Sequence, residues 1–295
     1  MILRLFRGAF AQFCQQYRSH VNSAKRIPAF LSILLGNAHR GKNTLVWIPI
    51  VTTVHTFSWS RSQSNEPNVK TLDELFDQNK FEEICQKLAP FKDGNNVDYL
   101  WRYARALYKR SKVAANETER KNLVMEGFEV AERALQFGPK VAPVHKWFSI
   151  LLDAKSHFEG MKERITVTEK VKQHMLKAVE LDPKDSTTFY MLGVWCYEVT
   201  ILPWYQRKIA STIFAKPPDS TYEEALSFCE RAEKISPNFY SLNLLLMGKI
   251  YDKLGQKDKA VEFLKRARDY KATTDDDKNA NKEAKEILAS LGVKN

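Results

Sequence analysis

The feature that most constrains this chain is a repeated spacing of alanine and proline. The segments ALQFGP at residues 134–139, AVELDP at 178–183 and AEKISP at 232–237 each place a proline five residues after an alanine. Each alanine follows a run with helical periodicity, and proline cannot continue a helix because it lacks the backbone N–H and clashes with the preceding turn. The three segments therefore mark three helix ends, and their recurrence predicts a chain built from helical repeats.

The clearest repeat lies near the C-terminus. Leu244, Met247, Gly248 and Tyr251 follow the spacing of the tetratricopeptide pattern W-x2-L-G-x2-Y, and Ala260 begins its second half, A-x3-F. The pattern needs small residues where two antiparallel helices touch, because larger side chains would push the helices apart. We therefore expect Gly248 and Ala260 to lie at such a contact.

Other copies are less regular. One opens at Phe189, Leu192 and Gly193 and ends at Pro237, and it holds about twenty residues more than the 34-residue unit allows. Weaker copies cover residues 145–183 and 100–139. The predicted fold is all-α: a tetratricopeptide-like superhelical solenoid of paired antiparallel helices over residues 68–295, preceded by an unpacked basic leader over residues 1–67.

The leader holds most of the formal net charge of +11, because eight Lys and Arg residues and no acidic residue precede Glu66. The nearly neutral remainder lacks the broad basic surface that nucleic acids require, so we expect no nucleic-acid partner. An acid-free N-terminus in which Arg4 and Arg7 interrupt apolar residues is typical of mitochondrial transit peptides. A basic tail without a targeting role remains the alternative. The uncharged stretch 43–60 is long enough for a weak membrane segment, although Pro49 and His55 disfavour one.

Catalytic and metal-binding patterns are scarce. The sequence contains no HExxH, no GxSxG and no closely spaced pair of cysteines. The segment 36–42 matches GxxxxGK, but Asn43 follows it where a phosphate loop needs Ser or Thr. His145 and His174 are expected to approach one another across a repeat, more as packed side chains than as ligands. We expect no enzyme, no metal and no cofactor.

Several runs are more distinctive than the repeat pattern: HKWFSILLDAKSHFEGMKERI, LDPKD, GVWCYE, PWYQRKIA, PPDSTYEEAL and NFYSLNLLLMGKIY. Together they resemble the regulator of microtubule dynamics family over about residues 70–295. The resemblance implies a tetratricopeptide-like protein of the cytoplasm, the microtubule cytoskeleton and spindle poles, with tubulin or a spindle-associated protein as partner. Some members are mitochondrial, and the absence of an acidic phenylalanine motif in the leader argues against the branch that tethers mitochondria to the endoplasmic reticulum. The unusual insertion of this family-like sequence comprises Trp204, Tyr205, Gln206 and Arg207.

The first helix of each repeat in a solenoid lines a concave face where partners bind. By helical spacing, the outward positions on these helices combine cations with aromatic rings, which would suit an extended acidic peptide such as the acidic tail of tubulin. This predicted groove comprises Trp101, Arg105, Lys109, Lys146, Tyr190, Val194, Tyr197, Lys249 and Lys253. Ordinary solvated helix faces are the alternative interpretation.

The functional prediction is a non-catalytic microtubule-associated adaptor that acts through this groove. The alternative prediction is a mitochondrial helical-repeat protein that binds a lipid or a protein partner.

Overall fold

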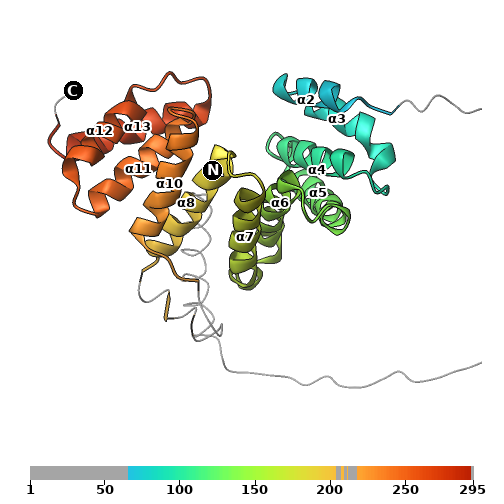
Figure 1. Cartoon of the computed structure of the whole chain (residues 1–295), viewed down its shortest axis with the longest axis horizontal. Helices are drawn as coiled ribbons and strands as arrows, with labels where there is room; N and C mark the ends of the chain where they lie inside the picture. Colours follow the sequence, from blue (N-terminus) through green and yellow to red (C-terminus); the bar gives the residue numbers. More distant parts are fainter. Residues whose placement is uncertain (1–65, 204–206, 209–210, 212–217, 294–295) are drawn as a thin grey trace, which may run out of the picture. The chain divides into compact units, whose positions relative to one another are not determined.

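The computed structural model describes residues 66–203, 207–208, 211 and 218–293, and within these ranges it contains helices and no strand (Figure 1). The predicted all-α fold is confirmed. Residues 1–65, which include the phosphate-loop-like segment 36–42 and the possible membrane segment 43–60, lie outside the described residues. The domain boundary near residue 67 therefore stays a prediction.

The described residues form eleven α-helices and one short 3-10 helix. In chain order they are α2 (Val69–Asp77), α3 (Phe81–Leu88), η1 (Ala89–Phe91), α4 (Val97–Ser111), α5 (Glu117–Phe137), α6 (Ala142–Glu159), α7 (Met161–Leu181), α8 (Ser186–Thr200), α10 (Tyr222–Ile235), α11 (Ser241–Lys253), α12 (Lys257–Arg268) and α13 (Asp275–Ser290). In the part of the chain described, none of these helices has the length and apolarity that a membrane span requires.

Side chains at the helix starts explain several of these boundaries. Asn96, Asn116, Asp185 and Thr221 each accept a hydrogen bond from a backbone N–H in the first turn of the helix that follows. Such a cap satisfies a donor that has no partner within the helix, and its loss typically costs about 0.5–2 kcal/mol. The helix starts are therefore encoded locally, one cap at a time.

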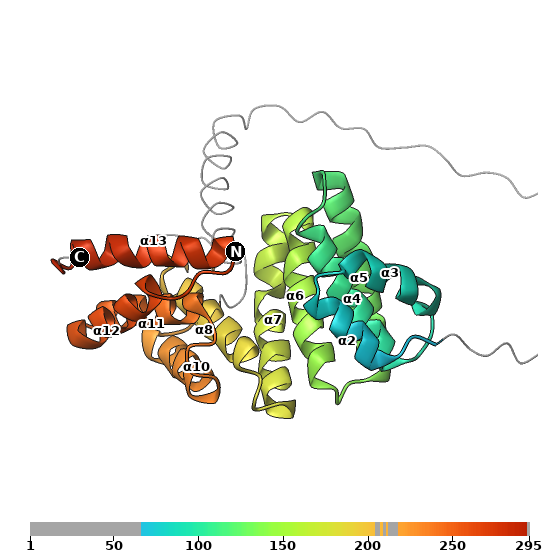
Figure 2. The ribbon, with the colours of Figure 1, turned by 90° about the horizontal axis from the view of Figure 1, so that it is seen from above.

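Consecutive helices pack as hairpins, and Figures 1 and 2 show them side by side. The most extensive packing joins α4 with α5, α6 with α7, α8 with α10, and α11 with α12. These pairs are the two halves of successive repeats, as the sequence pattern predicts.

Two glycines inside helices allow close approaches between paired helices. A Cβ added at Gly248 in α11 would lie 2.6 Å from Cγ of Leu264 in α12, and one at Gly193 in α8 would lie 2.4 Å from Sγ of Cys229 in α10. Ala260 is fully buried in the same α11–α12 contact region. The prediction that Gly248 and Ala260 lie at a helix–helix contact is confirmed.

The last helix covers the end of the repeat array. Leu264, Ala284 and Leu288 belong to a small apolar cluster beneath α13, separate from the main core that runs from α2 to α12. Asp277 fastens this helix, since its carboxylate accepts a 2.6 Å hydrogen bond from the Ser241 hydroxyl of α11 as well as bonds from the cap residue Thr274. A final helix that buries the exposed end is what a solenoid needs to remain soluble.

Candidate functional site

The aromatic side chains of the predicted groove are buried. Trp101 and Tyr190 are 8% exposed and Tyr197 is 7% exposed. Tyr190 packs edge-on against the ring of Tyr240, with centroids 5.1 Å apart, and Tyr197 packs against Tyr222 at 6.0 Å. The expectation that these rings project outward is wrong: Tyr197 is covered by α10 of its own repeat, and Tyr190 by the segment that leads into α11 of the next one.

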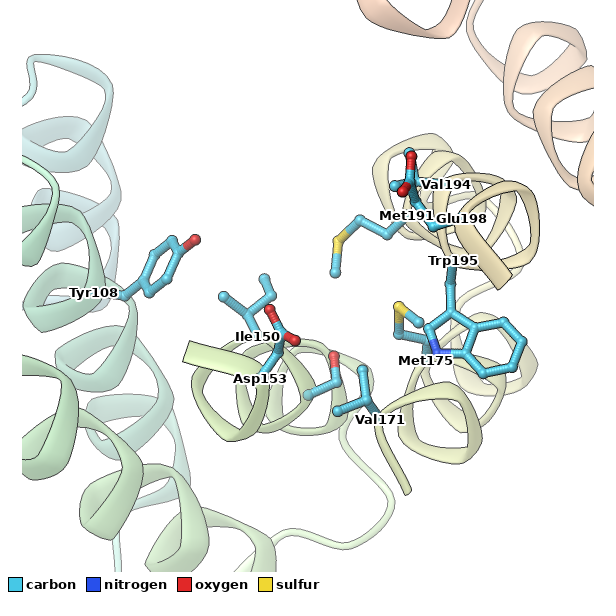
Figure 3. A pocket seen from close by; sticks show the side chains of 10 residues that line it. Tyr108, Ile150, Asp153, Val171, Met175, Met191, Val194, Trp195 and Glu198 are labelled. Carbon is cyan, nitrogen blue, oxygen red and sulfur yellow. The ribbon is translucent and has the colours of Figure 1, made fainter. Parts of the chain in front are cut away.

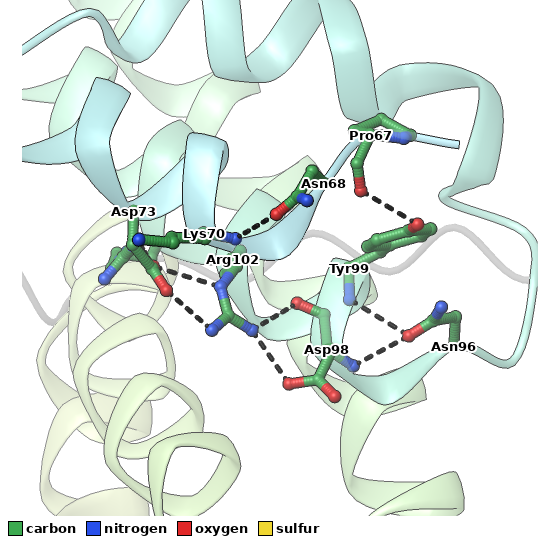
Figure 4. Close-up of polar contacts among 9 residues, drawn as sticks. Pro67, Asn68, Lys70, Asp73, Asn96, Asp98, Tyr99 and Arg102 are labelled. Atoms are coloured by element: carbon green, nitrogen blue, oxygen red, sulfur yellow. Dashed lines mark hydrogen bonds and ion pairs between the residues drawn. The ribbon is translucent and has the colours of Figure 1, made fainter. Parts of the chain in front are cut away.

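Arg105 of the predicted groove belongs to an ion-pair network that joins α2 to α4. Its guanidinium lies 2.8 Å from a carboxylate oxygen of Asp73 and 3.6 Å from the centroid of the Phe76 ring. Arg102 holds the same Asp73 carboxylate through two hydrogen bonds of 3.0 and 2.8 Å and also bonds to Asp98 (Figure 4). Burial acts to raise the pKa of Asp73, but the hydrogen bonds and charges of the two arginines outweigh it and hold that pKa below its usual value.

Two lysines of the predicted groove are also paired within the chain. Lys146 lies 2.8 Å from a carboxylate oxygen of Asp185, and Lys249 forms an ion pair with Glu283 of α13. By contrast, Lys253 is exposed, and the half-buried Lys109 lies 5.9 Å from the Phe76 ring centroid. Among the described residues, the ion pairs found involve neither Lys109 nor Lys253. The predicted groove is therefore not one continuous free cationic surface.

The insertion is described only in part. Trp204, Tyr205 and Gln206 lie outside the described residues. Arg207 donates a 3.1 Å hydrogen bond to the carbonyl of Leu202 and lies 3.6 Å from a carboxylate oxygen of Asp219. Its guanidinium therefore braces the start of the insertion, and a binding role for these residues stays a prediction.

An open cleft of about 480 Å³ lies between α4, α6, α7 and α8, a volume that includes solvent at its mouth (Figure 3). Apolar side chains from α6, α7 and α8 form most of its lining, and α4 contributes a tyrosine ring. The lining residues are Tyr108, Ser149, Ile150, Asp153, Val171, Met175, Met191, Val194, Trp195 and Glu198. Of the residues predicted for the groove, Val194 is the one that lines this cleft.

The cleft arises from a local change in helix packing. Helix α4 packs on α6, whereas no comparable packing joins α6 and α8 in the part of the chain described. The contact of α7 with α8 is also less extensive than that of α5 with α6. The facing sides of α6 and α8 are consequently left partly uncovered, and their side chains become the two sides of the cleft.

Trp195 forms one side of the cleft, and contacts with α7 hold its ring in place. The indole N–H of Trp195 donates a 3.2 Å hydrogen bond to the carbonyl of Thr168 in α7. The ammonium of Lys172 lies 4.6 Å from the ring centroid and is itself held 2.7 Å from a Glu224 carboxylate oxygen. Because its N–H and ring are both engaged, Trp195 presents a fixed apolar surface.

The polar end of the cleft is formed around Asp153. Burial raises the pKa of Asp153, although the charges of Arg164 and Lys112 act in the opposite direction. Nε2 of His157 lies 3.8 Å from Oδ2 of Asp153. Burial, assisted by the positive charges of Arg164, Arg120 and Lys112, lowers the pKa of His157 to about 4. His157 is therefore neutral at pH 7 and does not compensate the carboxylate.

His145 and His174 meet as predicted, with their Nδ1 atoms 2.9 Å apart and their rings stacked. Nε2 of His145 lies 2.9 Å from the carbonyl of Pro139, which can only accept, so this nitrogen carries the proton. The two Nδ1 atoms share a hydrogen bond between α6 and α7. Within the described residues, no group of three His, Cys, Asp or Glu side chains is placed to hold a metal ion.

Comparison with known proteins identifies the family. The model of the family described as Regulator of microtubule dynamics protein 1-3 matches residues 68–292. The chain belongs to this family. Regulator of microtubule dynamics protein 1 of Bos taurus is 42% identical over 231 residues, which cover 78% of this chain and 73% of the relative. The Homo sapiens protein of the same name is 45% identical over 66% of this chain and 62% of its own length. Regulator of microtubule dynamics protein 3 of Xenopus laevis is 38% identical over 66% of this chain and 42% of its own length.

Solved structures support the fold of this regulator of microtubule dynamics family member. A thermophilic tetratricopeptide-repeat protein of Thermus thermophilus matches with a TM-score of 0.50 and 12% identity, over 74% of this chain and 97% of that protein. This likeness confirms the predicted tetratricopeptide-like repeat fold. At such low identity it carries no information on ligands.

Sequence reasoning missed most of the cleft in this family member. Met191, Trp195 and Glu198 lie in the strongly apolar helix α8, where the spacing points to a core and carries no signal of an opening. The feature of the sequence that indicates unusual packing near the cleft is the irregular length of the repeat that contains α8. An irregular repeat predicts some departure from regular stacking, but it does not say on which side of the helix the departure occurs.

Proposed function

We propose that this member of the regulator of microtubule dynamics family is a non-catalytic adaptor that holds a segment of a partner protein in the cleft between α4, α6, α7 and α8. The observation that carries the proposal is the cleft itself, which is concave, open and mostly apolar. Apolar side chains form most of its lining, as they do in ligand sites generally. Membership of the regulator of microtubule dynamics family supports a role of this adaptor in microtubule dynamics.

The lining of the cleft supports binding more than catalysis. The hydroxyl of Ser149 donates to the carbonyl of Lys146 at 2.7 Å in its own helix, so it is engaged as a structural donor. Met175 and Met191 supply flexible and polarisable side chains, which adapt to varied apolar partners. An adaptor needs this combination of a shaped apolar surface and no strained reactive group.

Filling the cleft tests the proposal. The variant Ile150→Trp should obstruct the cleft, and Leu176→Trp, at a 38% exposed position on α7, is the matched control. The full chain is added to cell extract in which microtubules grow, and growth and shrinkage rates are measured by microscopy. We expect Ile150→Trp to lose the effect of the parent chain and Leu176→Trp to keep it. An Ile150→Trp protein that melts like the parent and still alters microtubule dynamics would contradict the proposal.

Co-sedimentation with microtubules made of purified tubulin shows whether tubulin itself is the direct partner. If microtubules assembled from tubulin alone sediment the parent chain and not Ile150→Trp, the cleft binds tubulin itself. If they sediment neither and the effect persists in extract, an associated protein is the partner. Salt dependence of sedimentation distinguishes charge-driven binding from apolar binding, because salt screens exposed charges.

The leader is proposed to direct the protein to mitochondria, on the strength of its acid-free, arginine-containing composition. Imaging of the full chain tagged at its C-terminus tests this proposal. The variant with Arg4, Arg7 and Arg18 changed to Glu should lose mitochondrial signal. Mitochondrial signal that is unaffected by the three charge reversals would contradict it.

A further inference from the structure

The cleft offers a ligand no unbalanced charge. Two of the ten described residues that line it are acidic, and none of the ten is a Lys, Arg or His. Glu198 is 5% exposed and already has an interaction partner within the chain. Burial raises the pKa of Asp153, and the positive charges of Arg164 and Lys112 act on the same carboxyl group. A ligand therefore meets a lining that is neutral in effect.

One polar group of the lining is left for a ligand to use. The hydroxyl of Ser149 donates to the carbonyl of Lys146 at 2.7 Å, and the indole N–H of Trp195 donates to the carbonyl of Thr168 at 3.2 Å. The hydroxyl of Tyr108 differs from both, because it has no hydrogen-bond partner among the described residues. Figure 3 shows this hydroxyl pointing toward the open space of the cleft.

The ring of Tyr108 is held in place by its neighbours. It packs against Trp147 with the ring centroids 6.0 Å apart, and the ammonium of Lys112 lies 4.3 Å from its own centroid. Burial and the nearby Asp153 raise the pKa of Tyr108, although Arg120 acts in the opposite direction. The phenol therefore keeps its proton at neutral pH and can donate a hydrogen bond. A donor that is already fixed costs less ordering on binding than a mobile one.

The space inside the mouth of the cleft is narrow. The volume that the centre of a water-sized molecule can occupy there is about 40 Å³. One water molecule takes about 10–15 Å³ of such space, and a cavity of about 150 Å³ holds a benzene molecule. The interior therefore suits the branched end of an aliphatic side chain better than a whole aromatic ring.

We infer that the cleft receives the end of an uncharged aliphatic side chain from a non-helical segment of a partner protein, and that the hydroxyl of Tyr108 donates a hydrogen bond to a backbone carbonyl of that segment. This inference rests on the proposed function, since it names the class of segment that the same cleft holds. A non-helical segment fits because its carbonyls are not already accepting bonds within a helix. Charged side chains of either sign are excluded, because the lining would not compensate their lost hydration. An acidic tail is therefore not the cleft ligand.

Three blocked amino acids test the inference. They are the N-acetyl, N-methylamide derivatives of leucine, lysine and glutamate, which share the same backbone carbonyls and differ in the charge of the side chain. Each is titrated into the full chain labelled with ¹³C at the methionine methyl groups. The signals of Met175 and Met191 report on the cleft, and the signal of the buried Met247 in α11 is an internal control. We expect the leucine derivative to bind about tenfold more tightly than the other two, because burying an uncompensated charge opposes binding.

A tyrosine variant tests the hydrogen bond. Tyr108→Phe removes the hydroxyl and keeps the ring, so the affinity for the leucine derivative should fall about fivefold, as the loss of one neutral hydrogen bond allows. Tyr222→Phe is the matched control, since it removes a hydroxyl at a half-buried position of α10, away from the cleft lining, and should have no effect. Melting curves confirm that both variants are folded. An unchanged affinity in folded Tyr108→Phe would overturn the inference.

The titrations separate failure of this inference from failure of the proposed function. Equal affinities for the three derivatives, or tighter binding of the lysine or glutamate derivative, would overturn the inference and leave the cleft as a binding site. Unshifted signals of Met175 and Met191 with every derivative would also overturn it. In that case, loss of the effect on microtubules in Ile150→Trp would still support a cleft-bound partner of other chemistry, whereas a retained effect would overturn the proposed function as well.

The chain's own first residues include aliphatic side chains, Leu3 and Leu5 among them. The full-chain variant with both leucines changed to Ser should leave the Met175 and Met191 signals unchanged if the occupant is a separate partner. A shift of both signals in this variant, with Met247 unaffected, would overturn a separate partner in favour of the leader as occupant.

Discussion

The α11–α12 pair and the facing helices α6 and α8 differ in how closely the two helices approach one another. The first is a close-packed contact and the second borders an open cleft. In the first, Gly248 removes a side chain from the contact, so that Leu264 packs directly against the backbone of α11. In the second, Ile150 and Asp153 face Met191 and Val194 across an open cleft. Close packing contributes stability and leaves little surface exposed, whereas the open arrangement leaves apolar surface available to a partner. One repeat chain can therefore hold both rigid contacts and a binding site.

The largest expected effect comes from breaking the close contact. Gly248→Leu inserts a side chain where even a Cβ would lie 2.6 Å from Cγ of Leu264. We expect the free energy of unfolding to fall by about 1–3 kcal/mol, because overpacking forces neighbouring side chains out of their preferred rotamers. Urea denaturation measures the change. The control Ala289→Leu, at an exposed position of α13, should change stability by less than about 0.5 kcal/mol. A Gly248→Leu protein as stable as the parent would show that the helices can separate freely there.

Acid should weaken the α6–α7 pair that borders the cleft. Burial lowers the pKa of His174 to about 4, assisted by His145 and Lys170, and His157 has a pKa lowered to the same value. An unfolded histidine titrates near pH 6.5, so the unfolded state binds more protons and stability is lost as pH falls from about 6.5 toward 4. Each histidine should cost about 1–2 kcal/mol at pH 5. His174→Gln should flatten this dependence, measured by urea denaturation between pH 7.5 and 5. An unchanged pH slope in that variant would assign the effect to other groups.

The sequence pattern predicts the close α11–α12 contact but does not predict the cleft between α6 and α8. Gly248 and Ala260 were assigned to a helix contact because the repeat pattern prescribes small residues within one repeat, and the structure places them there. The helical spacing predicts an outer face for Tyr190 and Trp101, yet both are buried, and Tyr240 of the segment before α11, in the next repeat, covers Tyr190. The pattern specifies packing inside a repeat and leaves the distance between repeats open. The cleft, which depends on that distance, could not be found from spacing alone.

The tight C-terminal end should respond to acid in a lower pH range than the α6–α7 pair. Burial would raise the pKa of Asp277, but hydrogen bonds from Ser241, Thr274 and the backbone lower it to about 2. The stability that this carboxylate contributes is present above about pH 4 and is lost as pH falls toward 2. Asp277→Asn should cost about 1 kcal/mol at pH 7, since it weakens a helix cap, and should remove the loss between pH 4 and 2. A variant that retains the full acid response below pH 4 would show that Asp277 does not control it.

The smallest effect is expected from the two cations of the predicted groove that lack an ion pair among the described residues. Lys109→Gln with Lys253→Gln should change the free energy of unfolding by less than about 0.5 kcal/mol, because the ion pairs found among the described residues include neither lysine. Exposed charge contacts are worth about 0.2–1 kcal/mol each, so co-sedimentation with microtubules should weaken only modestly and only at low salt. Arg105→Gln is the informative contrast, because its guanidinium is held 2.8 Å from Asp73 and its loss should lower stability. If the double lysine variant abolished sedimentation while melting like the parent, the free cations would be the main partner surface, and the open cleft would lose its functional distinction from the close-packed pair.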